Sequence, residues 1–398
     1  MQGCRSRHGD NRCAPAGEKR RPVRILAVPL NAPPLYITDQ ATLAGFCAGL
    51  RDVDMLALDT EFIRDSSYYP RLCLIQIAGA GQIACIDPLA LPSLDPLLAL
   101  LYNPGILKVL HAAHQDMEVL FQSGGAVPAP IFDTQLAALV LGEGSQIGYA
   151  DLVARRLGVV LDKAHARADW QRRPLEPAWL SYAADDVRYL PDLYRQQRAA
   201  LIERNWLAAL AEDFAVLCEP QRYQPQPQDA WRRIREHPRL RGVQRAVLRA
   251  LAAWRETQAM QQDRPRRWIL GDHTLLDLAR RMPRTPEELA RAQDLPPATL
   301  ARHGAVLLER IAAARAELPE QWPTRPRRPQ LAARQVEQVD ILLTMIAARA
   351  HACGIPPQLL AGREDVERLL VGEDVPLRHG WRAAVLDGVL PPLEQLRR

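Results

Sequence analysis

An acidic pair closes an apolar run early in the chain and is the first feature that could support catalysis. Residues 53–62 are largely apolar and end in the stretch DTEF, which predicts a strand. Side chains alternate along a strand, so Asp59 and Glu61 point to one face and Thr60 to the other. Two neighbouring carboxylates repel each other unless a proton or a cation intervenes. An isolated pair of acidic residues at this position more often marks a strand end that is exposed to solvent. A catalytic role therefore requires further acidic residues.

A third acidic residue follows a second apolar run. Residues 106–110 predict another strand, and Asp116 lies at the start of the helix expected over residues 116–122. In an open α/β sheet, a carboxylate placed just after a strand lies at the edge where ligands usually bind. Asp116 could therefore belong to the same site as the acidic pair.

A tyrosine and two aspartates lie together on a later helix, expected over residues 177–190. The stretch YAADD contains Tyr182, Asp185 and Asp186. Tyr182 and Asp186 are four residues apart and share one helix face, whereas Asp185, three residues from Tyr182, can share it too. Periodicity alone leaves both aspartates open as the fourth acid.

The elements expected around these residues form a sheet covered by helices. Strands are expected over residues 53–62, 71–78, 82–86 and 106–110. Helices are expected over residues 37–50, 94–102, 116–122, 149–157 and 177–190. Strands that precede a mostly helical stretch predict an α/β domain ending near residue 215.

Proline-rich stretches divide the rest of the chain. Pro220, Pro225 and Pro227 lie among glutamines, and a second stretch near residue 325 alternates proline with arginine, which predicts two linkers. The expected units are a disordered tail over 1–34, the α/β domain over 35–215, a linker over 216–229, a helical domain over 230–318, a linker over 319–329 and a helical domain over 330–398.

Composition and charge restrict the class of protein. Of the 398 residues, 48% are hydrophobic and 24% charged, as in ordinary globular chains. The formal net charge is +5, yet residues 221–270 alone hold 12 arginines and four acidic residues, a net charge of +8. This division of charge indicates a module that binds a polyanion, although solvated helix faces would produce it too.

The cysteines and the hydropathy of the chain indicate the cellular compartment in which the protein is expected. The seven cysteines are scattered and include no C-x-x-C pair, so they support neither a zinc ribbon nor a disulfide framework. No apolar run reaches the ~18 residues needed to cross a membrane. We therefore expect a cytoplasmic protein, and a monomer.

The order of the three acidic motifs resembles the DEDD-type 3′–5′ exonucleases of the tyrosine subtype, ribonuclease D above all. The matching stretches span most of residues 50–200 and are LDTEFIR with SYYPRLCLIQIA, KVLHAAHQDMEVL and DWQRRPLEPAWLSYAADDVRYL. In that family the last acid lies four residues after the tyrosine, which selects Asp186 over Asp185. The histidine subtype requires a histidine five residues before that acid, where this chain has Ser181.

The resemblance extends into the helical part. The stretch LRALAAWRETQAMQQDRPRRWILGD is similar to an HRDC domain, and HGWRAAVLDGVL is similar to the second, more diverged helical repeat of ribonuclease D. The implied architecture is an α/β ribonuclease H-like exonuclease domain followed by two all-α HRDC-type helical domains.

The resemblance also implies the chemistry. Asp59, Glu61, Asp116 and Asp186 would hold two divalent metal ions, and carboxylate oxygens suit Mg²⁺ or Mn²⁺. Two such ions can hold the attacking water and the departing 3′ oxygen of an in-line displacement, while Tyr182 would orient the water. The implied function is a 3′–5′ exoribonuclease that acts on RNA with a free 3′ end, tRNA precursors in particular, and releases nucleoside 5′-monophosphates.

Two other functions stay open. A DNA-directed 3′–5′ exonuclease would carry the same motifs, because discrimination between RNA and DNA depends on contacts to the 2′-OH. A non-catalytic RNA-binding scaffold would keep the fold, and the loss of one acid would have supported it. All four acids are present.

Further residues are candidates for substrate contacts. Phe62 could stack on the terminal base or complete the core. His111 could contact the terminal ribose or phosphate, or be a buried histidine with both nitrogens hydrogen-bonded. Gln76 is expected near the site on a neighbouring strand, and the two arginines face either phosphates or solvent. The full set is Thr60, Phe62, Gln76, His111, Arg172 and Arg173.

An arginine cluster lies beside an aromatic residue in the first helical domain. Arg264, Arg266 and Arg267 precede Trp268, a combination suited to phosphate contact plus stacking. We nevertheless expect the tryptophans of this domain to form its core: Trp231, Trp254 and Trp268.

Overall fold

A mixed six-stranded sheet forms the centre of the N-terminal part of the chain. The computed structural model describes residues 33–144, 146–162, 165, 168–235, 237–324 and 329–390, so the expected tail lies outside these ranges except for its last two residues. The strand order is β1-β4-β3-β2-β5-β6. The strands are β1 (Leu35–Ile37), β2 (Met55–Ile63), β3 (Arg71–Gly79), β4 (Gln82–Ile86), β5 (Leu107–Leu110) and β6 (Ile131–Asp133). Strand β3 runs antiparallel to both of its neighbours, β2 and β4, whereas the pairs β1–β4, β2–β5 and β5–β6 are parallel.

The two edge strands differ from the sequence prediction. β1 and β6 have three residues each, too few for the alternation of side chains that identifies a strand. β1 includes Ile37, the first residue of the helix expected over 37–50. That helix, α1 (Gln40–Gly49), starts after Asp39, whose carboxylate accepts the backbone N–H of Thr42 at 2.9 Å.

Helices α3 and α6 carry the later acidic residues onto the sheet. α6 (Pro177–Arg188) packs against β2, β3 and β4, and α3 (His114–Gly124) packs against β2 and β3. The remaining helices of this domain are α2 (Asp95–Leu101), α4 (Thr134–Val140), α5 (Tyr149–Leu157), α7 (Leu190–Glu203) and α8 (Leu207–Leu217). Their apolar side chains form one core with the sheet.

The first expected linker, residues 216–229, is packed against the domains that it joins. It contains two 3₁₀ turns, η1 (Pro220–Arg222) and η2 (Pro227–Arg233), and each begins with a proline, which has no N–H to satisfy. Tyr223 between them is 4% exposed and lies beside Phe121 of α3. Buried aromatic residues therefore hold this segment in place, which proline and glutamine content alone did not indicate.

The next unit is a helical bundle with its own core. Its helices are α9 (Val243–Gln262), α10 (Arg266–Ile269), α11 (Asp272–Arg281), α12 (Pro286–Leu289) and α13 (Pro297–Ala316). Trp231 and Trp254 are buried in this core, as predicted. The prediction that Trp268 belongs to the core is wrong, because its side chain is 56% exposed. In the short helix α10, Ile269 turns inward instead.

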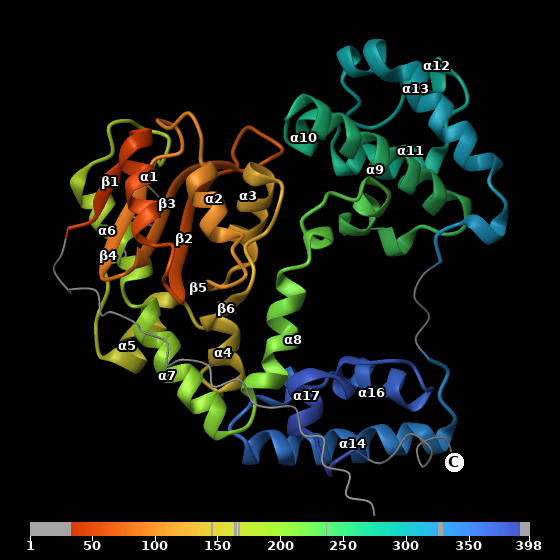
Figure 1. Cartoon of the computed structure of the whole chain (residues 1–398). Coiled ribbons are helices and arrows are strands. Elements are labelled where there is room, and N and C mark those ends of the chain that lie inside the picture. Colours follow the sequence, from red (N-terminus) through yellow and green to blue (C-terminus); the bar gives the residue numbers. More distant parts are fainter. Residues whose placement is uncertain are drawn as a thin grey trace, which may run out of the picture.

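The last helices return to the first domain. They are α14 (Ala333–Ala352), α15 (Pro357–Leu360), α16 (Arg363–Leu370) and α17 (Gly380–Val385). α17 contacts α8, and Figure 1 shows α14 and α17 at the end of α8 away from the bundle. Trp381 is fully buried in a core continuous with that of the sheet domain. Along the described ranges, no helix combines the length and apolar character needed to span a membrane.

Lys108, one of three lysines in the chain, is fully buried beside β5. Its ammonium group donates to the carbonyl oxygens of Asn103, Ile106 and Ala129 at 3.0, 2.7 and 2.5 Å. An ammonium group has three donors, and all three are used. These bonds fasten the loop before β5 to the loop before β6, and so fix the strands that lead into α3.

We expect Lys108→Met to lower the free energy of unfolding by about 2–4 kcal/mol, because three buried carbonyl groups lose their donor while the volume is nearly kept. Arg51→Met, at an exposed turn after α1, is the matched control and should change it by less than about 0.5 kcal/mol. Unfolding in guanidinium chloride, followed by circular dichroism, measures both. Equal midpoints for Lys108→Met and wild type would contradict the stabilising role of these bonds.

Candidate active site

The acidic pair lies in the second half of β2, at the centre of the sheet. Asp59 is directly opposite Gln76 of β3, and Gln76 is opposite Cys85 of β4. Residues that face each other across strands share one face of the sheet. Helix α6 crosses this face, and the Cys85 thiol lies 3.6 Å from the Leu180 carbonyl oxygen of α6. The alternation of β2 therefore turns Asp59 and Glu61 toward α6.

Asp116 reaches the pair because β2 is longer than β5. The two strands are paired only as far as Ala57 and Val109, so the rest of β2 has an open edge. The chain turns after β5 into α3, and Asp116 in its first turn comes beside β2. The Thr60 hydroxyl donates to the Asp116 carboxylate at 2.5 Å, and both side chains are buried.

The turn between β5 and α3 is held by an aspartate that the sequence analysis missed. The Asp133 carboxylate, at the end of β6, accepts the backbone N–H groups of Ala112 and Ala113 at 3.1 and 2.9 Å. It also caps α4 through the N–H groups of the next turn. Ala112 has a φ of +57°, a conformation that costs energy for a residue with a Cβ. Asp133 stabilises it, and the N-cap pattern Asp-Thr was the available signal.

Helix α6 supplies the fourth acid, and its two aspartates face different partners. Asp185 forms an ion pair with Arg188 at 2.7 Å, and its carbonyl oxygen accepts the Tyr149 hydroxyl at 2.9 Å. After burial, the charge of Asp186 raises the pKa of Glu61. Burial, then the charge of Asp185 and then that of Asp116 raise the pKa of Asp186. The choice of Asp186 as the fourth acid stays a prediction.

The four carboxyl groups share one poorly solvated volume. Burial, followed by the charges of neighbouring acids, raises the pKa of Glu61 to about 8. Burial raises the pKa values of Asp116 and Asp186 to about 7. The pKa of Asp59 is raised well above its usual value by burial and then by the other three acids. The charges of Asp116 and Asp186 therefore disfavour ionisation of Asp59 and Glu61, so either protons or cations must neutralise the set.

This donor set fits a hard divalent cation by its chemistry. Carboxylate oxygens are the ligands that Mg²⁺ and Mn²⁺ prefer, and a bound dication favours the ionised form of every neighbouring acid. Among the described residues, no three acidic, histidine or cysteine side chains are already gathered as closely as a single bound metal would hold them. Mutual repulsion among the four carboxyl groups opposes such closure before a cation binds.

Tyr182 lies one helical turn before Asp186 on α6. Burial and the charges of Asp186 and Glu61 raise the pKa of its hydroxyl well above the usual value. Its ring lies between those of Trp170 and His165, with centroids 6.4 and 6.0 Å away. At neutral pH this hydroxyl keeps its proton, so it acts as a hydrogen-bonding group and not as a base.

The structure divides the six candidates for substrate contacts. Phe62 packs against the core of the sheet domain, and Thr60 is engaged with Asp116. Both nitrogens of His111 are within hydrogen-bond distance of internal partners, the Thr134 hydroxyl at 2.9 Å and the Ile147 carbonyl at 3.0 Å. These three side chains therefore have structural partners of their own.

The two arginines of this set differ from each other. Arg173 makes a two-point ion pair with Asp87 at 2.6 and 2.7 Å and donates to the Cys73 carbonyl, so internal partners occupy its guanidinium group. Arg172 is 61% exposed and pairs only loosely with Glu176, at 3.4 Å. Arg172 is thus the arginine that remains accessible to a phosphate.

Comparison with known proteins defines the class. The sheet domain matches the family model described as 3′-5′ exonuclease over residues 34–201, and the bundle matches the HRDC domain model over residues 244–311. Fold and site together define a 3′–5′ exonuclease, a metal-dependent nuclease fold, with an attached HRDC domain. That model match does not include residues 330–390, whose HRDC character stays a prediction.

Relatives define the family. Ribonuclease D of Acidiphilium cryptum (strain JF-5) is 41% identical to this chain over 359 residues, which cover 88% of this chain and 90% of that protein. The crystal structure of Escherichia coli RNase D, described as an exoribonuclease involved in structured RNA processing, matches with a TM-score of 0.78 and 31% identity, over 91% of this chain and 98% of that one. The chain belongs to the ribonuclease D family and is a 3′–5′ exoribonuclease.

Gln76 is the unusual residue of the site. It is fully buried opposite Asp59, and neither its amide oxygen nor its amide nitrogen has a hydrogen-bond partner in the described part of the chain. A buried polar atom without a partner costs about 1–3 kcal/mol. Such a cost is typical of functional sites, where stability is given up for activity.

We expect Gln76→Met to raise the free energy of unfolding by about 1–2 kcal/mol and to lower turnover, because an isosteric apolar side chain removes the unpaired groups beside Asp59. Gln197→Met is the matched buried control. Gln197 has one unpaired amide oxygen, but its amide nitrogen donates to the Thr134 carbonyl at 2.9 Å, so its substitution leaves that buried carbonyl without a donor and should lower stability. Denaturant unfolding in EDTA measures the change in stability, and single-turnover assays measure the change in turnover. A destabilised Gln76→Met would show that Gln76 has partners that stabilise the fold.

Proposed function

We propose that Asp59, Glu61, Asp116 and Asp186 hold two divalent cations, Mg²⁺ or Mn²⁺, with which the enzyme hydrolyses the last phosphodiester bond of an RNA strand. One observation carries this proposal: four carboxyl groups come together from β2, α3 and α6, and, beyond the effect of burial, the charges of Asp116 and Asp186 raise the pKa values of both Asp59 and Glu61. A set of acids gathered at this electrostatic cost needs a bound charge of opposite sign.

The protein's own residues would position the reaction. Metal ions in such a site activate water and neutralise charge on the departing 3′ oxygen. The Tyr182 hydroxyl, kept protonated, would hydrogen-bond to the attacking water and orient it toward the phosphate. The Thr60 hydroxyl holds the Asp116 carboxylate in one orientation, and Asp133 holds the turn that carries it. The products would be a nucleoside 5′-monophosphate and an RNA shortened by one residue.

We propose RNA with a free 3′ end, tRNA precursors in particular, as the substrate. The Escherichia coli relative is described as acting in structured RNA processing, and the arginine-rich HRDC unit would supply affinity for a polyanion. The accessible Arg172 is one side chain of the catalytic domain that would contact a phosphate. The cytoplasmic location and the monomeric state remain predictions.

The choice between the adjacent aspartates can be tested directly. We expect Asp186→Asn to lower kcat by about 10³-fold or more, because several kcal/mol of metal-assisted stabilisation is lost. Asp185→Asn removes an ion pair that is partly exposed and should change kcat by less than about threefold. The readout is 5′-monophosphate released from a short RNA in Mg²⁺. If Asp185→Asn were inactive and Asp186→Asn active, the assignment of the fourth acid would be reversed.

The metal and the nucleic acid can be tested together. A tRNA-like RNA with a 3′ extension should be shortened in Mg²⁺ or Mn²⁺, and EDTA should abolish the reaction because the carboxylates have no other cation to organise them. Matched single-stranded DNA should be degraded more slowly. Nucleotide release that survives EDTA would exclude the two-metal mechanism, and faster release from DNA would exclude the RNA preference.

Tyr182→Phe tests the orienting role. We expect kcat to fall by about 10²-fold with KM nearly unchanged, because a hydrogen bond to the attacking water is made in the transition state and not in substrate binding. The shape of the pH–rate profile between pH 6 and about 9 should be unchanged, because the tyrosine stays protonated throughout. Loss of an alkaline limb in the variant would indicate that Tyr182 acts as a base after all.

A further inference from the structure

The HRDC unit is attached to the catalytic domain through one loop. Tyr68, between β2 and β3, is buried in the core of the HRDC unit. Its hydroxyl donates to the Glu256 carboxylate at 2.5 Å, and the guanidinium group of Arg266 lies 4.7 Å from the centre of its ring. The backbone N–H groups of Tyr68 and Tyr69 both donate to the Asp263 carboxylate at 3.0 Å. The loop between β2 and β3 therefore belongs to the catalytic domain in sequence and packs into the HRDC unit.

Arg266 serves this attachment. It makes a two-point ion pair with Glu256 at 2.5 and 2.7 Å, and Glu256 is only 2% exposed. Of the cluster expected to bind phosphate, Arg266 therefore has an internal role. Arg267 and Trp268 beside it remain exposed.

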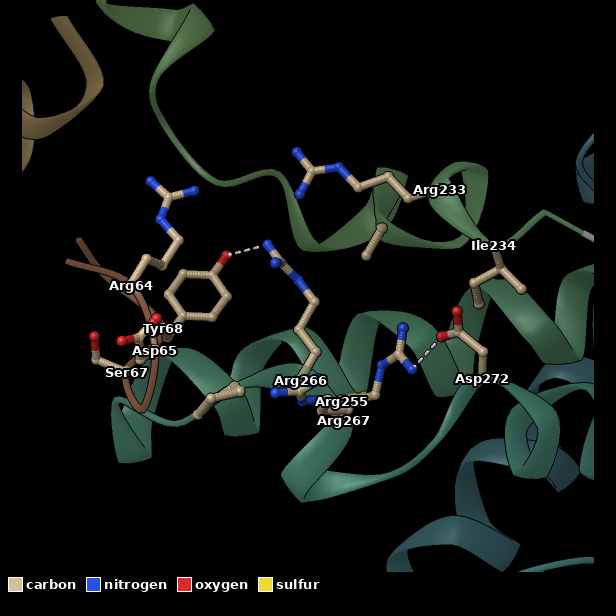
Figure 2. Close-up of a pocket in the computed structure, with 12 residues that line it drawn as sticks. Arg64, Asp65, Ser67, Tyr68, Arg233, Ile234, Arg255, Arg266, Arg267 and Asp272 are labelled. Atoms are coloured by element: carbon tan, nitrogen blue, oxygen red, sulfur yellow. Dashed lines mark hydrogen bonds and ion pairs between the residues drawn. The ribbon is translucent and has the colours of Figure 1, made fainter. Parts of the chain in front are cut away.

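A cleft of about 600 Å³ opens next to the attachment. In Figure 2, the guanidinium groups of Arg64, Arg233 and Arg266 point toward one another around the ring of Tyr68. Arg233 is 69% exposed and lies 3.9 Å from Glu256, beyond hydrogen-bond distance. Arg64 pairs with Glu118 at 2.8 Å but is 42% exposed. Arg267 also lines the cleft and forms no ion pair with any described residue.

A second cleft, of about 240 Å³, continues this surface toward the active site. It shares Arg64 and Arg233 with the first cleft and adds Arg222 and His114. His114 is the first residue of α3, which carries Asp116 in the same turn. Six arginines and three acidic residues line the two clefts together. An arginine-rich surface thus extends from the HRDC unit to the catalytic helix.

We propose that this arginine junction, formed by Arg64, Arg222, Arg233 and Arg267, binds consecutive phosphates of the RNA strand upstream of its 3′ end. The proposal rests on the proposed function, because it supplies the substrate path of that site. Arginine side chains suit phosphate groups by geometry and charge. The surface is lined by six arginines, which can contact a backbone without reading its sequence.

An RNA strand is favoured over an acidic peptide as the occupant. The junction reaches the first turn of α3, the helix that also carries Asp116. Trp268, exposed directly after Arg267, offers a face on which an unpaired base can stack. The 216–229 segment and the rest of η2 have a role in this arrangement, since they carry Arg222 and Arg233, which line the same cleft as Arg64.

The test uses the full-length double variant Arg233→Gln/Arg267→Gln, which leaves Arg266 and the Tyr68 attachment intact. Its matched control is Arg302→Gln/Arg310→Gln, which removes the same charge from exposed positions on α13. Binding of a labelled single-stranded RNA of about 20 nucleotides, longer than one single-strand site, is followed by fluorescence anisotropy in EDTA. Turnover of a dinucleotide in Mg²⁺ is measured separately.

We expect the Arg233/Arg267 variant to bind the long RNA about 10–100-fold more weakly than wild type. Its slope of log affinity against log salt should be smaller by about 1.4, since two phosphate contacts are lost. Dinucleotide turnover by both double variants should equal that of wild type. Unchanged RNA affinity, an equal loss in the α13 control, or weakened binding of a polyglutamate peptide with RNA binding intact would overturn the proposal.

The two proposals fail in different ways. If wild type released no nucleotide from the dinucleotide in Mg²⁺, the proposed catalytic function would fail, while binding in EDTA would still test the junction. If dinucleotide turnover were normal and RNA affinity did not depend on Arg233 and Arg267, the junction alone would be excluded.

Discussion

Repulsion among four carboxyl groups, one buried and three half-buried, is the interaction on which the arrangement of this molecule depends. Burial and neighbouring charges raise the pKa of Glu61 to about 8, a state that a folded chain tolerates only if rigid elements keep the groups together. Strand β2 supplies two acids through its alternation, and the overhang of β2 past β5 makes room for Asp116. Bonds from Thr60 and Asp133 then fix the third acid. These contacts hold the carboxyl groups together against their repulsion, which a bound cation would reduce.

Features encoded over a few residues could be predicted from the sequence. Strand alternation placed Asp59 and Glu61 on one face, and the four-residue spacing on α6 put Asp186 beside Tyr182. Periodicity could not exclude Asp185. The resemblance selected Asp186, and the contacts of Asp185 with Arg188 and with Tyr149 of another helix became known only from the structure.

Features that depend on distant partners could not be predicted. Arg173 and Asp87 are 86 residues apart in the chain, and no local pattern indicates that they pair. Arg266 has a nearer partner in Glu256, but its role depends on Tyr68, 198 residues away. An arginine that binds RNA and one that holds two domains together look alike in sequence. The difference is whether a buried acidic side chain lies close enough to form an ion pair. Glu256 does so with Arg266, and no acidic residue of the described part of the chain does so with Arg267.

The return of the last helices to the first domain has a consequence for how the chain is made. Val339, Leu342 and Trp381 belong to one core with the sheet, and α17 covers α8. A domain that emerges from the ribosome first can usually fold before the rest is synthesised. Here α8 keeps an apolar face uncovered until α17 has been translated. The HRDC unit takes Tyr68 and Tyr69 from the first domain, and the rest of its core lies within residues 230–322. This unit can therefore form its core during that interval, before the domain that precedes it in the chain is complete.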